Sequence, residues 1–175
     1  LFVLPSRPCR HGAVERFTQA EARRARDVWQ RIMRGNDRVV VDTDLTQDQI
    51  ASYNLVCFGD FYGNRFLASI ASGLPIQWQD DQIRVGDQSF DASSHALAMV
   101  YPNPKNPNRY VVVNSGLTFR EFSNSTNSRQ IAMLPDWAVI DISRPADGIY
   151  PGRIAAADFF GETWQLETAA SLPQE

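Results

Sequence analysis

The sequence predicts one three-layer α/β domain with a doubly wound, mostly parallel sheet and an antiparallel hairpin extension. Three observations predict this class. Residues 1 to 73 alternate strand, helix, strand, helix, strand, helix, and helical connections of this kind join parallel strands. Residues 54–58 are almost entirely apolar, which is typical of a strand buried on both faces. Finally, 175 residues with 43% hydrophobic side chains suffice for one sizeable core.

The first strand and helix have clear local signals. Residues 2–4 form a short apolar strand closed by Pro5. Thr18 and Glu21 have the spacing of a capping box, which predicts that a helix begins there. Apolar residues then recur at helical spacing, and Gly35 is the expected C-terminal stop.

The next two strand–helix pairs follow the same logic. The β-branched residues 38–41 predict a strand, and Thr46 with Gln49 predicts a capped short helix. After the apolar strand at 54–58, the pattern from Arg65 is helical and ends at Gly73.

The second half of the chain changes to strands joined by turns. Residues 96–101 and 110–113 flank a proline- and asparagine-rich turn and predict an antiparallel hairpin. The other elements expected here are a hairpin of 76–78 with 82–85, a helix capped by Thr118 and Glu121, a polar loop at 123–129, a strand at 137–142, and an edge strand or turn within 157–164.

Charge and hydropathy exclude several partners. The net charge is −3 and the pI is near 5.4, which argues against nucleic acid because phosphate binding needs a basic surface. The arginines between 23 and 34 are interpreted as the solvated side of a helix. No apolar run approaches the ~20 residues that a membrane-spanning helix needs.

The sequence carries no motif for a cofactor or a metal. Neither a dinucleotide-binding nor a phosphate-loop glycine pattern occurs, and the two cysteines and two histidines lack metal-ligand spacing. Cys57 is expected in the core. Cys9, followed by an arginine and a histidine, is a weak candidate for a nucleophile. No residue is assigned a catalytic role.

The loop from Gly59 to Asn64 is the first candidate binding segment. It lies between a buried strand and a helix, where ligands of open α/β sheets gather. Its candidate residues are Gly59, Asp60, Gly63 and Asn64. The alternative is a tight turn with Gly59 at positive φ and Asn64 as the helix cap, and Asp60 would repel a phosphate.

A second loop ends the strand at 110–113. Asn114, Ser115 and Gly116 share the expected edge of the sheet with the first loop, so that both would line one polar crevice. His95 is the remaining candidate and precedes a buried strand. It is interpreted as a hydrogen-bonding structural residue, since no nucleophile-elbow pattern accompanies it.

Five stretches resemble a C-terminal accessory domain of bacterial, planctomycete-type prolyl-oligopeptidase-like and esterase-like α/β-hydrolase proteins. They are residues 54–60 with Asn64, 74–78, 101–107 (Y-P-N-P-K-N-P), 109–116 (R-Y-V-V-V-N-S-G) and 134–139. The resemblance spans roughly residues 17 to 165. It implies an accessory domain of a secreted or periplasmic hydrolase, whose own nucleophile and triad have no counterpart here.

Three functions follow as hypotheses. The first is a non-catalytic accessory or interaction domain, cut from a longer chain, that docks a catalytic hydrolase domain or holds a glycan or peptide. The second is a small-ligand-binding module of flavodoxin-like, Rossmann-like build. The third is a hydrolase that uses His95 with Ser93, Ser94 or Ser115 and with Asp60 or Asp91.

Overall fold

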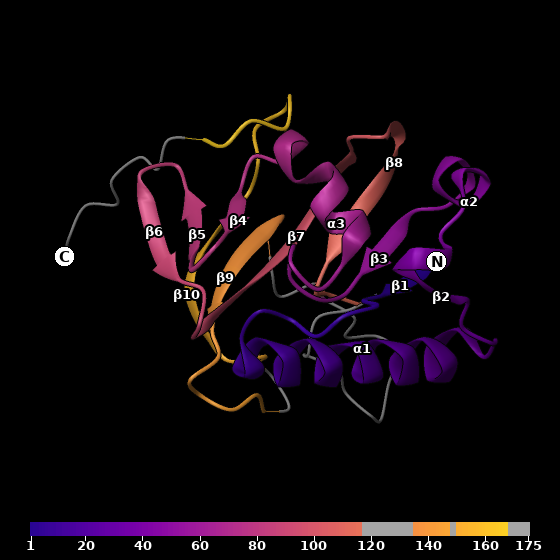
Figure 1. Cartoon of the computed structure of the whole chain (residues 1–175), viewed down its shortest axis with the longest axis horizontal. Helices are drawn as coiled ribbons and strands as arrows, with labels where there is room; N and C mark the ends of the chain where they lie inside the picture. Colours follow the sequence, from indigo (N-terminus) through magenta and orange to yellow (C-terminus); the bar gives the residue numbers. More distant parts are fainter. Residues whose placement is uncertain (117–134, 148–149, 168–175) are drawn as a thin grey trace.

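The computed structural model describes residues 1–116, 135–147 and 150–167, and these residues form two β-sheets and three α-helices (Figure 1). The larger sheet has seven strands in the order β10-β9-β7-β8-β3-β1-β2. The smaller sheet has three strands in the order β4-β5-β6.

The strands are β1 (Phe2–Leu4), β2 (Val39–Val41), β3 (Leu55–Cys57), β4 (Gln77–Gln79), β5 (Gln82–Val85), β6 (Gln88–Asp91), β7 (His95–Asn103), β8 (Asn106–Val113), β9 (Trp137–Asp141) and β10 (Arg153–Asp158). The α-helices are α1 (Gly12–Met33), α2 (Gln47–Ser52) and α3 (Arg65–Ile70). A short 3-10 turn at Asp42–Asp44 follows β2, and another at Ala71–Gly73 follows α3.

The predicted doubly wound, mostly parallel sheet is wrong. The pairings β1–β2, β1–β3 and β3–β8 are parallel, whereas β7–β8, β7–β9 and β9–β10 are antiparallel. A parallel neighbour needs a long crossover, and among the residues that the structure describes only the first three strands are followed by helices. The second half is built from hairpins and turns, so it extends the sheet as an antiparallel unit and adds a separate small sheet.

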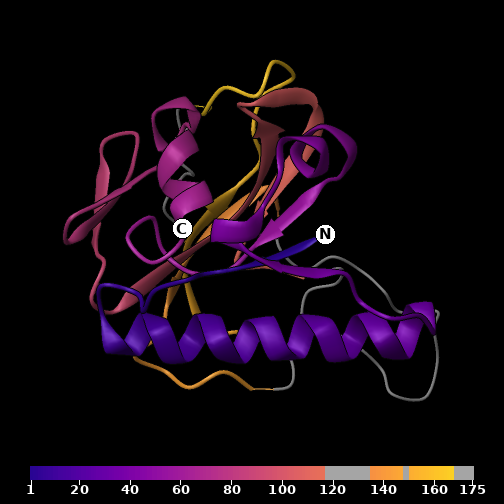
Figure 2. The ribbon, with the colours of Figure 1, turned by 45° about the vertical axis from the view of Figure 1, so that its right-hand side comes forward.

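The large sheet is covered on both faces (Figures 1 and 2). Helix α1 runs along one face, and α3 with the small sheet lies on the other. Strands β1 and β3 alternate accordingly. Val3, Leu55 and Cys57 face the larger core on the α3 side, whereas Phe2 and Val56 face α1. Strands buried on both faces explain why residues 54–58 read as an unbroken apolar run.

Helix α1 is longer than predicted. It begins at Gly12 with His11 as N-cap, so Thr18 and Glu21 lie inside the helix and are buried. The Thr18 hydroxyl donates to the carbonyl oxygen of Glu15, and Glu21 pairs with Arg24 at 3.1 Å. The predicted capping box therefore marks a buried polar patch. The helix also ends without help from Gly35, because Arg34 adopts the left-handed conformation itself at φ 52°.

The two short helices begin where the sequence predicts. Thr46 caps α2 with a complete capping box, since its hydroxyl accepts from the Gln49 N–H and the Gln49 side chain accepts from the Thr46 N–H. Asn64 caps α3 by accepting from the Leu67 N–H. Both predictions depend on a local hydrogen bond that any fold would preserve.

The hairpin of β7 and β8 is also confirmed, and it is longer than its sequence pattern. Strand β9 lies where residues 137–142 predict it, and β10 begins a few residues before the expected edge segment. Strand β6 was not predicted. The expected cap at Thr118 and Glu121 and the expected polar loop at 123–129 lie outside the described residues.

The small sheet has one apolar and one polar face. Trp78, Ile83 and Phe90 are cross-strand neighbours that contact the larger core. The alternate positions of β4 and β5 are exposed. This arrangement follows directly from the period of two that residues 76–85 show in the sequence.

We expect Ile83→Ala to lower the free energy of unfolding by about 3 kcal/mol, because Ile83 is fully buried and truncation leaves a cavity. Arg84→Ala on the same strand is the matched control, and it should change stability by less than about 0.5 kcal/mol because Arg84 is exposed. Chemical denaturation of the two variants measures both values. Equal losses would contradict the orientation of β5.

Candidate functional site

The site lies at the edge of the large sheet where β1 and β3 end. From β1 the chain continues through α1 to β2 on one side, whereas after β3 it continues through α3 on the opposite face. The loops after β1 and β3, residues 5–11 and 58–64, therefore diverge between adjacent strands. Ligands of open α/β sheets bind at such switch points, outside the carboxyl ends of the strands.

Asp60 organises the two loops. It is buried, and its Oδ1 accepts from the N–H groups of Tyr62 at 3.1 Å and Gly63 at 2.6 Å. Its Oδ2 accepts from the Arg10 N–H at 2.7 Å. One carboxylate thus joins the loop after β1 to the loop after β3, and both of its oxygens are occupied.

The remaining predicted residues of the loop have structural roles. Gly59 has φ 109°, as the tight-turn interpretation requires. Asn64 is fully buried, and its Nδ2 donates to the carbonyl oxygen of Phe58 at 2.9 Å. A Cβ on Gly63 would lie 2.9 Å from the carbonyl oxygen of Arg7, so only glycine fits there without movement.

Asn114 does meet the Gly59 loop, as expected, but it does so as a structural bridge. Its Oδ1 accepts from the Gly59 N–H at 2.9 Å, and its Nδ2 donates to the carbonyl oxygens of Gly59 at 2.9 Å and Leu97 at 3.1 Å. Ser115 is half-buried beside it. Gly116 packs on α1, because a Cβ there would lie 2.8 Å from the Ala25 Cβ. These residues frame the edge and do not line an open crevice.

The open crevice lies between the loops after β1 and β3 on one side and α3 and the end of β4 on the other. It has a volume of about 290 Å³, near the lower limit for small-molecule sites. Its lining comes from the loop after β1, the loop after β3, α3 and its 3-10 turn, and the end of β4. The lining residues are Arg10, Asp60, Phe61, Tyr62, Ala68, Ala71, Trp78, Gln79 and Asp80.

Asp81, in the turn between β4 and β5, fastens the small sheet to the loop after β1. Arg10 Nε donates to Asp81 Oδ1 at 3.1 Å. His11 Nε2 lies 3.2 Å from the same oxygen, at ion-pair distance but without hydrogen-bond geometry. The crevice is therefore bounded by a segment that two neighbouring side chains hold in place.

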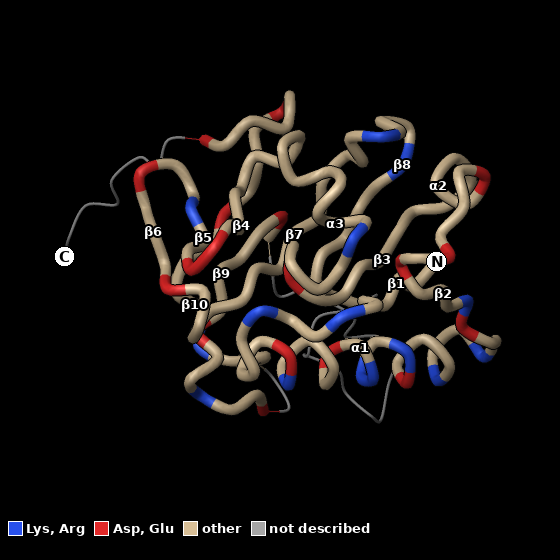
Figure 3. The backbone as a smooth tube through the Cα atoms, viewed as in Figure 1, with Lys and Arg blue, Asp and Glu red and all other residues tan. Residues whose placement is uncertain are grey.

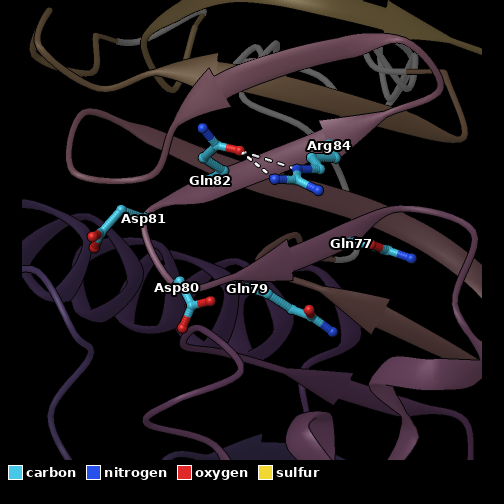
Figure 4. Close-up of a pocket in the computed structure, with 6 residues that line it drawn as sticks. All are labelled: Gln77, Gln79, Asp80, Asp81, Gln82 and Arg84. Carbon is cyan, nitrogen blue, oxygen red and sulfur yellow. Dashed lines mark hydrogen bonds between the residues drawn. The ribbon is translucent and has the colours of Figure 1, made fainter.

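A second polar hollow of about 360 Å³ continues from the crevice over the outer face of the small sheet (Figure 4). Gln77 lies opposite Arg84, and Gln79 lies opposite Gln82. The Arg84 guanidinium donates to the Gln82 amide oxygen at 2.9 and 3.0 Å. Gln79 and Asp80 line both hollows, which makes the two one continuous surface, with aromatic and apolar side chains in the crevice and polar side chains over the small sheet.

Acidic residues lie in the β4–β5 turn and at the end of β6 (Figure 3), and Asp60 lies in the loop after β3 at the same edge. Asp60 and Asp81 are already engaged with neighbouring groups, whereas Asp80 is exposed. The crevice consequently offers the Gln79 amide and the exposed Asp80 carboxylate, and the Arg10 guanidinium that lines it is already bonded to Asp81. That chemistry disfavours an anionic ligand.

His95 begins β7 at the same edge. Its Nδ1 lies 2.9 Å from the carbonyl oxygen of Asp91, which can only accept, so Nδ1 carries the proton in this bond. Ser94 Oγ lies 3.1 Å from that nitrogen and therefore cannot transfer its own proton to it. None of the hydrogen bonds between described residues joins His95 to Ser93 or Ser115. The arrangement does not activate a serine.

The cysteines are not poised for chemistry. Burial, followed by the nearby Asp60 carboxylate, raises the pKa of Cys9 to about 12. Burial also raises the pKa of Cys57, which lies in the core as predicted. Among residues 1–116, 135–147 and 150–167, no group of three His, Cys, Asp or Glu side chains is arranged to hold a metal ion. No helix in the described part of the chain is long and apolar enough to cross a membrane.

Sequence reasoning found the loop after β3 and missed most of the crevice lining. Arg10 and Tyr62 gave no signal, because neither belongs to a motif. The glutamines of β4 and β5 did give one: residues 76–79 and 82–85 alternate, which places the polar side chains of both strands on one face.

Comparison of the chain with protein-family models, with curated proteins and with solved structures finds no match. The resemblance to an accessory domain of hydrolases therefore stays a prediction.

Asn114→Ala should cost about 3 kcal/mol of unfolding free energy, because it leaves buried backbone groups of Gly59 and Leu97 without partners. Asn114 also has φ 48°, a left-handed conformation that costs alanine roughly 1 kcal/mol. Asn114→Gly removes the hydrogen bonds without this strain and should be less destabilised. If chemical denaturation shows that Asn114→Gly is less stable than Asn114→Ala, the left-handed conformation of residue 114 is contradicted.

Asp141 should make stability depend on pH. The Ser143 side chain, followed by its backbone N–H and the Arg153 guanidinium, lowers the pKa of Asp141 below its ordinary value of 3.8. The charged form is thus favoured in the fold, so its contribution is present above pH 3.8 and is lost as the pH falls through the lower native pKa. The stability difference between wild type and Asp141→Asn, measured by denaturation at several pH values, should shrink as the pH falls below this range. A constant difference would contradict the assignment.

Proposed function

We propose that this chain is a non-catalytic binding domain that holds a short, uncharged oligosaccharide in the crevice between the loops after β1 and β3. The observation that carries the proposal is the continuous surface that runs from this crevice, lined by aromatic as well as polar side chains, onto the polar face of β4 and β5. A ligand of several linked units fits an elongated surface better than a single small molecule does.

An exposed aromatic ring supports a sugar ligand. Tyr62 is 54% exposed at the mouth of the crevice. The Arg7 guanidinium lies 5.4 Å from the centre of its ring and donates to its carbonyl oxygen at 3.0 Å. An aromatic ring held at the surface offers an apolar face with a polar tip, which suits the mixed surface of a pyranose.

The polar groups of the crevice match hydroxyl chemistry. The Gln79 amide both donates and accepts, and the exposed Asp80 carboxylate accepts. Sugar hydroxyls also do both, so such groups bind them without a net charge on the ligand. The few carboxylates left unpaired here would repel a phosphorylated sugar.

We favour binding over catalysis because Asp60 and His95 already take part in structural hydrogen bonds. Asp60 accepts three backbone N–H groups, and the bonded proton of His95 faces a carbonyl oxygen. Neither is arranged as a base for a nearby nucleophile. Association with a secreted hydrolase is a compatible context, and it depends on the sequence resemblance alone.

Titration with cellotetraose, chitotetraose and maltotetraose tests the proposal by calorimetry and by amide shifts in NMR spectra. We expect one of the three to shift amides of residues 59–64 and 79–82. Tyr62→Ala should then weaken binding at least tenfold, which is about 1.4 kcal/mol.

Tyr150→Ala is the matched control, since Tyr150 is exposed to a similar degree, at 45%, and does not line the crevice. It should leave the affinity unchanged. The proposal fails if none of the three saccharides binds, or if both tyrosine variants lose the same affinity.

A further inference from the structure

Another hollow lies on the opposite face of the large sheet, between α1 and the strands. We call it the α1-side pocket, and its volume is about 440 Å³. Its floor is a row of three apolar side chains from adjacent strands, Phe2, Val56 and Val112, which the strand registers place side by side. Val56 and Val112 are only half-buried, so this floor is incompletely covered.

Aromatic rings form the sides of the pocket. Trp29 of α1 meets Phe2 edge to face, with ring centres 5.9 Å apart. Tyr53, which follows α2, lines the pocket as well. Gly116 closes one end by its tight approach to Ala25 of α1. A concave, mainly apolar surface with aromatic sides is the usual form of a small-molecule site.

The side chain of Arg38 lies at the rim. The Arg38 guanidinium lies 5.5 Å from the centre of the Tyr53 ring, and its Nη1 donates to the Tyr53 hydroxyl at 2.6 Å. Within the described ranges of the chain, no carboxylate pairs with Arg38. An arginine has five N–H donors in a planar fork, so one bond to Tyr53 orients the group and leaves donors for a ligand.

We propose that the α1-side pocket binds a small aromatic carboxylate, with its ring among Trp29, Phe2 and Tyr53 and its carboxylate on Arg38. The charge at the rim selects the acid over a neutral compound of the same shape, because a guanidinium pairs with a carboxylate through two parallel hydrogen bonds. The apolar floor excludes a fully polar anion such as phosphate. This site is independent of the saccharide crevice on the other side of the sheet.

Phenylpropionate and phenylpropanol test the proposal, since they share a ring and a chain and differ in the acid group. Titration of the full chain, followed by the Trp29 indole signal and the amides of Val56 and Val112 in NMR spectra, reports on the pocket itself. We expect phenylpropionate to bind at least tenfold more tightly than phenylpropanol, and added salt to narrow this difference.

Arg38→Gln should weaken phenylpropionate at least tenfold and leave phenylpropanol within twofold. Arg23→Gln is the control, because Arg23 is an exposed arginine of α1 outside the pocket, and it should change neither affinity. Val112→Phe, which fills the floor, should abolish binding of both compounds. Thermal unfolding shows whether each variant is folded. If Val112→Phe does not fold, the comparison of Arg38→Gln with Arg23→Gln tests the proposal.

Several results would overturn the proposal. These are no response of the Trp29 indole to either compound, equal affinity for the acid and the alcohol, or the same loss in Arg38→Gln and Arg23→Gln. The first result would mean that the pocket is closed to ligands, for example by another part of the chain.

Discussion

The side chain of Asn114 joins the parallel and antiparallel halves of the large sheet, and the candidate site depends on this bridge. Its three hydrogen bonds link the turn after β3 to β8 and to the backbone of β7. Asp60 continues the chain of contacts from β3 to the loop after β1. The edge that carries the crevice is thus held by buried polar groups whose loss leaves unpaired donors and acceptors.

Local patterns predicted the parts of the fold that depend on local physics. The caps at Thr46 and Asn64, the β7–β8 hairpin and the buried apolar strand β3 lie where the sequence places them. Thr18 and Glu21 show the limit of such patterns: the same spacing that caps a helix also occurs inside α1, where both side chains are buried. The predicted doubly wound, mostly parallel sheet was wrong for another reason, because no local signal states which strands become neighbours across the chain.

The sequence predicts that the loops of Gly59 and Asn114 lie together, and it assigns their polar side chains to a ligand. The loops of Gly59 and Asn114 do come together, but the Asn114 side chain and the Gly59 backbone form hydrogen bonds with each other. The residues left for a ligand, such as Arg10, Tyr62 and Gln79, belong to segments that meet only in three dimensions. The two pockets lie on opposite faces of the sheet: the crevice on the α3 side combines aromatic with charged and amide side chains, whereas the hollow on the α1 side is mainly apolar.

Strand β2 forms one edge of the large sheet, and its three valines are partly or largely exposed. An apolar edge strand of this kind can pair with a strand of another molecule. Here the ladder is only three residues long, preceded by Arg38 and followed at once by the 3-10 turn at Asp42–Asp44. An incoming strand finds three residues to pair with before it meets charged side chains at both ends. The short ladder and the charged residues that flank it therefore both disfavour the addition of a strand from another molecule at this edge.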